Sequence, residues 1–139
     1  MTPYKNIFKR FERMITDFDL DGIEIANKIE IEIELLNNAV AEYTNSIDDL
    51  SRDDTLKQFT NTLSEQSEKV LANYMVQGWC KPYVFSQDLF ETNFSTMEYQ
   101  KFSSAELMLR IQNLMAYAQK EAGRLSTRVS VKNVTGRLK

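Results

Sequence analysis

The side chains best suited to chemistry in this sequence are three glutamates at alternate positions, Glu30, Glu32 and Glu34. Paired carboxylates can act as general acid and general base. On a helix, however, positions 30 and 34 share one face while position 32 points elsewhere, and the sequence implies no Lys, Arg or metal partner nearby. We therefore interpret the run as an acidic stripe that faces solvent or a neighbouring subunit.

A second group of carboxylates lies in residues 17–22, Asp-Phe-Asp-Leu-Asp-Gly, and matches the opening of an EF-hand calcium loop. The rest of the loop does not fit. Its eighth position is Glu24 instead of an apolar residue, and its twelfth is Lys28 instead of a bidentate glutamate. We expect an acidic turn, whose carboxylates interact favourably with the positive N-terminal end of the next helix, and no metal site.

Composition excludes several classes of enzyme. The 139 residues include no His and a single cysteine, Cys80. A Ser–His or Cys–His nucleophile, a His-containing zinc site and an internal disulfide are therefore ruled out. We predict a protein that is not an enzyme and carries no cofactor. No stretch is long and apolar enough to predict a signal peptide or a transmembrane helix.

Charge is distributed unevenly along the chain. Residues 1–109 hold 10 basic and 19 acidic side chains, a net charge of −9, whereas residues 110–139 hold seven basic side chains and only Glu121, a net charge of +6. A basic end on an acidic body predicts contact with something negative. Nucleic acid, an acidic groove on a partner, and another copy of the body are all candidates. The candidate docking residues are the last five of these basic side chains, Arg124, Arg128, Lys132, Arg137 and Lys139.

Apolar spacing predicts helices over residues 4–18 and 23–47. Thr2 is a candidate cap of the first, with Pro3 at its first helical position. Residues 29–35 alternate like a strand, but the helical stripe continues over a much longer span, so we favour one long helix. The polar residues 48–62 predict a loop, with a short strand or turn near 56–59.

A third helix is expected from Ser64, capped by Ser64 itself or by Thr62 with Glu65 in a capping box. Gly78 permits close approach of another helix, and Pro82 should kink or end this one. The aromatic segment 83–101 predicts a short helical or looped excursion. The aromatic candidates for core packing or for a subunit or partner interface are Trp79, Tyr83, Phe85, Phe90 and Phe94.

The fourth helix opens with a capping-box sequence at Ser103–Glu106 and should fade between Ser126 and Lys132. The whole pattern predicts an all-α fold, a four-helix bundle-like domain over residues 1–126 followed by an extended basic tail over 127–139.

The order of these segments resembles that of the head-to-tail adaptor (neck or connector) proteins of long-tailed bacteriophages. The matching features include Leu-Leu-Asn-Asn-Ala-Val-Ala-Glu-Tyr at 35–43, Asp-Leu at 49–50 and Phe-Thr-Asn at 59–61. The most specific is the capped helix 63–83, with its Leu-Ala-Asn-x-Met and Trp–Lys–Pro ending. The resemblance covers nearly the whole chain.

This resemblance implies a structural virion protein of the phage neck, made in the host cytoplasm and not bound to a membrane. Such proteins form a homo-oligomeric ring, commonly dodecameric, whose C-terminal segment docks onto the portal protein. The far side of the ring receives a downstream neck or tail-completion protein, and genome DNA passes through the channel. The basic residues listed above would then be portal-docking or DNA-proximal. The alternative is a nucleic-acid-binding helical module that acts through the stripe formed by Arg124, Arg128 and Lys132.

Overall fold

The computed structural model describes residues 1–15, 25–46, 48–85 and 104–137. Helices dominate these residues, which confirms the predicted helical class, but a small sheet accompanies them. The elements are β1 (Thr2–Pro3), α1 (Tyr4–Met14), α2 (Ile25–Glu42), β2 (Arg52–Asp53), β3 (Gln58–Phe59), α3 (Glu65–Phe85) and α5 (Ser104–Arg137). The candidate calcium loop at 17–22 lies outside the described residues.

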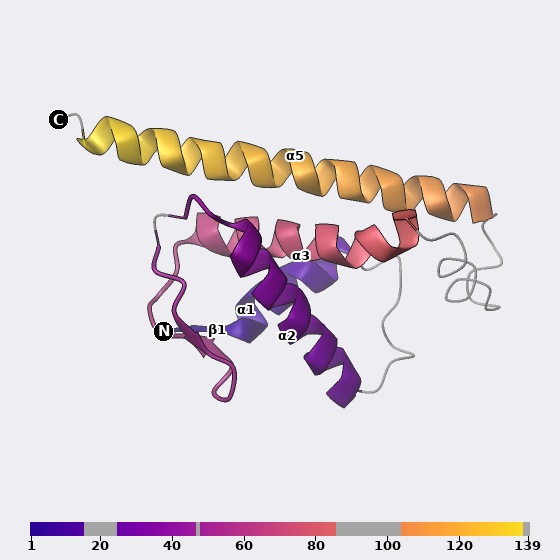
Figure 1. Ribbon diagram of the computed structural model, residues 1–139, viewed down its shortest axis with the longest axis horizontal. Coiled ribbons are helices and arrows are strands. Elements are labelled where there is room, and N and C mark those ends of the chain that lie inside the picture. The colour runs from indigo at the N-terminus through magenta and orange to yellow at the C-terminus, as the bar shows by residue number, and fades with distance from the viewer. Residues whose placement is uncertain (16–24, 47, 86–103, 138–139) are drawn as a thin grey trace.

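Helix α3 lies at the centre of the described residues, and each of the other three helices formed by those residues packs against it (Figure 1). Its buried positions are not confined to one stripe, because consecutive residues such as Val70, Leu71 and Ala72 are all buried. A helix that is apolar on several sides must be covered on several sides. The core therefore forms around α3, with α5 along one side and α1 and α2 beneath it.

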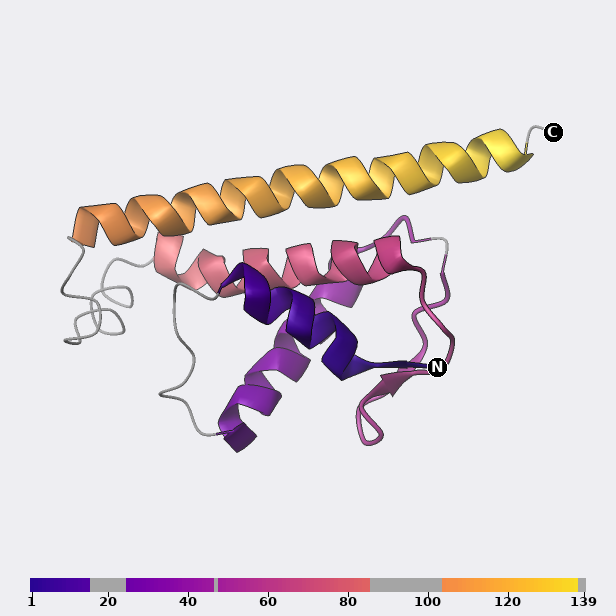
Figure 2. The ribbon, with the colours of Figure 1, turned by 180° about the vertical axis from the view of Figure 1, so that it is seen from behind.

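The predicted four-helix bundle is not confirmed. In both ribbon views α5 runs alongside α3, whereas α1 and α2 cross beneath α3 (Figures 1 and 2). The alternating segment 29–35 is helical, as expected, and lies within α2. Gly78 also acts as predicted: a Cβ at this position would lie 3.1 Å from Cδ2 of Leu35, so α2 approaches α3 closely at this point.

The three short strands, which the sequence indicated only as a short strand or turn near 56–59, form an antiparallel sheet in the order β1-β3-β2. This sheet changes the role of Thr2. Instead of capping α1, Thr2 pairs with Phe59 in the sheet, and its hydroxyl accepts a buried hydrogen bond of 2.8 Å from the Leu63 amide. Pro3 is extended and precedes the first helical residue, Tyr4.

Side chains from three elements meet at the hairpin formed by β2 and β3. The hydroxyl of Tyr4 donates to Oδ1 of Asp54 at 2.6 Å, and the amide of Asn37 donates to Oδ2 of the same carboxylate at 3.2 Å. The guanidinium of Arg52 donates to Oδ1 of Asn37 at 2.7 Å. This network ties the start of α1 and the middle of α2 to the hairpin.

Four helix ends differ from the sequence expectation. Helix α1 ends at Met14 instead of near residue 18, and α2 ends at Glu42 instead of near residue 47. Helix α3 does not end at Pro82 but continues to Phe85. Pro82 is exposed and lies three residues before the end of α3, so it has no N–H to donate to the carbonyl of Gly78, one turn earlier. Helix α5 does not fade after Ser126 but extends to Arg137. The residues assigned to an extended tail, up to 137, are therefore helical.

The N-terminus of α3 is capped by Ser64, whose hydroxyl oxygen accepts from the Ser67 amide at 3.2 Å. Asp48, from the preceding loop, reinforces this end. Its Oδ2 accepts from the Ser64 amide at 3.1 Å, from the Ser64 hydroxyl at 2.9 Å and from the Ser67 hydroxyl. Burial raises the pKa of Asp48, but the hydrogen bonds from Ser67 and Ser64 outweigh it, and the net pKa lies below the ordinary aspartate value.

We predict that Asp48→Asn destabilises the protein by about 1–2 kcal/mol at pH 7, because the charged acceptor at the start of α3 is lost. A lowered folded-state pKa means that this stabilisation is present above the unfolded pKa and is lost as pH falls through the folded value. Urea unfolding at pH 7 and at about pH 3 should therefore show the difference between variant and wild type shrinking on acidification. Asp49→Asn is the comparison variant, since Asp49 is exposed and its hydrogen bonds come from Ser51 and Asn61 instead of from the start of α3.

Candidate functional site

The basic C-terminal segment is carried on a continuous helix. Leu125 and Ser126 are buried, and the Ser126 carbonyl accepts a bond of 3.5 Å from the Asn45 side chain, so α5 is anchored to the body up to this point. Beyond it, the helix projects past the rest of the molecule towards the C-terminus (Figures 1 and 2). Positions 124, 128 and 132 follow at successive turns, with a rise of about 6 Å each.

The basic candidates differ in how far the structure describes them. Arg124 is exposed and pairs with Glu121 within the same helix, with its Nη2 at 2.8 Å from Oε2. This hydrogen bond lowers the pKa of Glu121, and the pair leaves part of the Arg124 charge neutralised. Arg128, Lys132 and Arg137 lie on the described helical backbone, but their side chains are outside the described part. Lys139 lies outside the described residues altogether.

The aromatic candidates gather at the C-terminal end of α3. Trp79 is buried and meets the half-buried Tyr83 edge to face, with ring centroids 5.2 Å apart. Phe85 is 76% exposed at the helix end. Phe90 and Phe94 lie outside the described residues. Trp79 and Tyr83 are thus tied to the core, while Phe85 offers an apolar side chain to the surface.

The acidic run in α2 divides as its spacing predicted, but one member is not on the surface. Glu30 and Glu34 are exposed, whereas Glu32 is only 3% exposed and its Oε2 has no hydrogen-bond partner among the described residues. The interpretation of all three as a surface stripe is therefore wrong for Glu32. Its position could have been inferred from the helix, since Glu32 shares a face with Leu36 and Ala39, which are also buried.

Glu32 has charged neighbours, and the expectation of no Lys or Arg nearby is wrong, since Lys28 lies one turn before Glu32 on the same helix. Its pKa is raised to about 7, chiefly by burial and also by the nearby Glu12 carboxylate, whereas Lys28 opposes the rise. The Lys28 ammonium pairs with Oε1 of Glu12 at 2.6 Å. The three side chains join α1 to the start of α2. A carboxyl group in this setting can take up a proton near neutral pH, but it is buried and has no described opening to a substrate.

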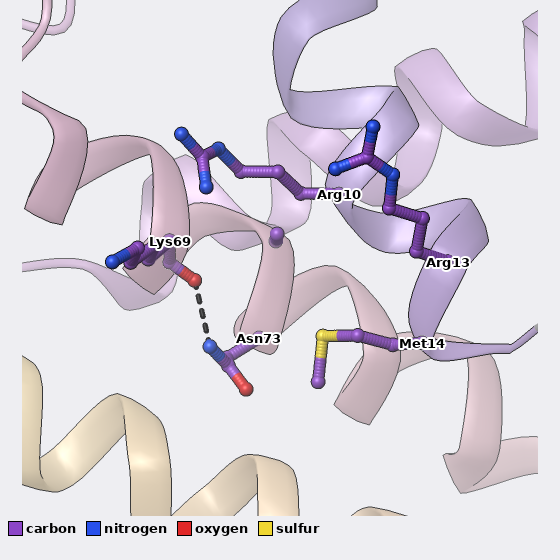
Figure 3. A pocket seen from close by; sticks show the side chains of 6 residues that line it. Arg10, Arg13, Met14, Lys69 and Asn73 are labelled. Carbon is purple, nitrogen blue, oxygen red and sulfur yellow. Dashed lines mark hydrogen bonds between the residues drawn. The ribbon is translucent and has the colours of Figure 1, made fainter.

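A basic pocket lies between α1 and α3, and the sequence interpretation missed it. It has a volume of about 220 Å³ and is rimmed by cationic side chains over an apolar floor (Figure 3). Arg10 lies 3.8 Å from Glu68 and 4.0 Å from Glu65, and Lys69 lies 3.4 Å from Glu65, so part of the positive charge is already balanced. The lining residues are Arg10, Arg13, Met14, Lys69, Ala72 and Asn73.

Neither metal ligands nor the single cysteine form a candidate site in the described part of the chain. No group of three or more Cys, Asp or Glu side chains there is placed to hold a metal ion. Cys80 is buried, and burial raises the pKa of its thiol to about 12, which disfavours the reactive thiolate. None of the described helices has the length and apolarity needed to cross a bilayer.

Comparison with family models, with curated proteins and with solved structures found no match to this chain.

We predict that Glu32→Gln stabilises the protein at pH 8 by about 2–3 kcal/mol and has little effect at pH 4. The raised pKa means that the folded state favours protonated Glu32. Below the pKa of Glu32 in the unfolded state, the side chain is neutral in both states and its burial carries no penalty for ionisation. The free energy of unfolding then falls as pH rises from that value through the folded-state pKa near 7. Chemical unfolding across this pH range measures the difference. The matched control is Glu30→Gln, an exposed position on the same helix, for which the pH profile should follow that of wild type.

Proposed function

We propose that this protein is a structural component of a bacteriophage neck, in which copies form a ring that joins the portal to the next neck or tail component around the DNA channel. The resemblance in the sequence suggested this role. The structural observation that supports it is that α5 continues as a helix beyond the packed body. After Leu125 the helix leaves the body and extends to Arg137, and no acidic residue follows Glu121.

A projecting basic helix is suited to docking in an acidic groove of another protein. A preformed helix presents its side chains at fixed spacing and loses little conformational freedom on binding. The body of this chain is strongly acidic, so the helix carries charge of the opposite sign away from it. In the proposed assembly, this end of α5 would dock on the portal.

The opposite end of the molecule has a different character, which supports a second partner there. Figure 1 shows the C-terminal end of α3 and the N-terminal end of α5 together, far from the projecting C-terminus. Phe85 at the end of α3 is 76% exposed, and Leu109 near the start of α5 is 56% exposed. Exposed apolar side chains at one end and a basic helix at the other fit a connector that lies between two unlike proteins.

The test is assembly with the portal protein encoded nearest to the gene of this chain. Sizing with mass measurement should show a complex of portal and several copies of this protein. A chain ending at Ser126 keeps the buried anchor residues, and it should fold normally but lose portal binding by at least about tenfold. The full chain with Lys120→Ala, an exposed basic residue elsewhere on α5, should bind as wild type. A full chain that stays monomeric and ignores the portal would overturn the proposal.

The nucleic-acid module remains the second candidate, favoured by one observation: positions 124, 128 and 132 lie on one uninterrupted helix. Under this alternative, duplex DNA would bind without any portal. Replacing Arg128, Lys132 and Arg137 by Ala would reduce the slope of log affinity against log salt by about 3. Fluorescence anisotropy over a range of salt concentrations measures this slope. Under the connector proposal, the same measurement should give only weak DNA binding at physiological salt.

A further inference from the structure

Helices α1 and α2 present surfaces of opposite charge on opposite sides of the molecule. In Figure 1 α2 lies in front and α1 lies behind, and in Figure 2 the order is reversed. Each helix buries one face against the body and leaves the other exposed. The exposed charges on the outward face of α1 are all positive, and those on the outward face of α2 are all negative.

The outward face of α1 is basic. Its buried residues are Tyr4, Ile7 and Phe11, and the exposed positions on the other side are Lys5, Asn6, Lys9 and Arg13. Three of these four are cationic, and none is acidic. Because positions 5, 9 and 13 are four residues apart, they form one stripe about 12 Å long.

The outward face of α2 is acidic. Six of its described side chains are exposed. Three of them are carboxylates and none is a cation. Glu30 and Glu42 mark the ends of this stripe, about 18 Å apart along the helix. The exposed side chains are Glu30, Ile31, Glu34, Asn38, Ala41 and Glu42.

We propose that these two faces are the two halves of one contact between copies of this protein, in which the α2 face of one copy lies against the α1 face of the next. The proposal rests on the ring assembly proposed above and names the surfaces that form it. A contact between two different surfaces of identical chains is head-to-tail, and repetition closes into a ring when the rotation per copy divides the circle.

The basic pocket beside α1 provides the apolar part of this contact. Arg13 belongs to both the α1 stripe and the pocket rim, and the floor beside it includes the half-buried Met14 and the buried Ala72. On the α2 face, Ile31 is 43% exposed and lies between Glu30 and Glu34 along the helix. An aliphatic side chain flanked by carboxylates complements, in polarity and in charge, a largely apolar pocket that has a cationic rim and one buried amide, that of Asn73.

The contact between copies should be weak, because its ion pairs are exposed to solvent. Exposed ion pairs each contribute little and are screened by salt, so the charges determine the orientation and pairing of the copies more than the affinity. We expect association that weakens as salt rises, and that is favoured further when a portal ring holds the copies side by side.

Charge reversal tests the proposal directly. Replacing Lys5, Lys9 and Arg13 by Glu makes both faces acidic, and replacing Glu30, Glu34 and Glu42 by Lys makes both faces basic. Each variant alone should raise the protein concentration needed for half-maximal association by at least about tenfold. An equimolar mixture should regain assembly, because every contact between unlike variants then joins opposite charges. Sizing with mass measurement, with and without the portal protein, gives the readout.

Circular dichroism checks that each variant keeps the helical content of wild type. If a triple variant unfolds, Lys9→Gln and Glu34→Gln replace it, and each should weaken association measurably. Lys120→Glu, on the exposed side of α5, is the control and should assemble as wild type. Wild-type assembly that is unchanged in both charge variants, or a mixture that stays dissociated, would overturn the assigned contact and leave the connector proposal standing. Wild type that fails to assemble even with the portal would overturn both.

Discussion

The rest of the structure depends on the need to cover α3. Val70, Leu71, Met75, Val76 and Cys80 are fully buried, and together they occupy more than one side of the helix. No single neighbour could remove all of this surface from water, so three helices are required. Helix α5 covers one side along its length, while α1 and α2 cover the remaining sides by crossing α3. This arrangement leaves α1 and α2 with outward faces on opposite sides of the molecule.

Local patterns in the sequence sufficed for the helices themselves. The apolar stripe correctly overruled the strand-like alternation at 29–35, and Ser64 was identifiable as a cap because a hydroxyl before an apolar run satisfies the first free amides. Tertiary contacts decided the exceptions. Threonine is a common residue at helix caps, but the Thr2 hydroxyl instead accepts a hydrogen bond from the Leu63 amide, 61 residues away. The two-residue strands are too short to leave a periodic signal.

The candidate surfaces were predictable to the extent that they lie on single helices. The basic end of α5 is visible as a charge imbalance, and the separation of Glu32 from Glu30 and Glu34 follows from helical spacing. Lys28 lies one turn before Glu32 on α2 and could have been inferred from helical spacing, whereas Glu12 comes from α1 and is brought near Glu32 only by the fold. The basic pocket likewise needs Arg13 from one helix and Lys69 from another. Spacing along one helix cannot reveal a site that two helices share.

The length of α5 has a consequence for how its last turns are held in helical form. A separate peptide of residues 127–137 would be too short to form a stable helix in water, because the first turn must be ordered before any hydrogen bond repays that ordering. Within the protein, the turns anchored on α3 have already supplied this nucleus. Each further residue then loses only its own conformational freedom and gains one backbone hydrogen bond in return. The burial of Ala122, Leu125 and Ser126 therefore sets the helicity of a segment that extends about 17 Å beyond the last of them.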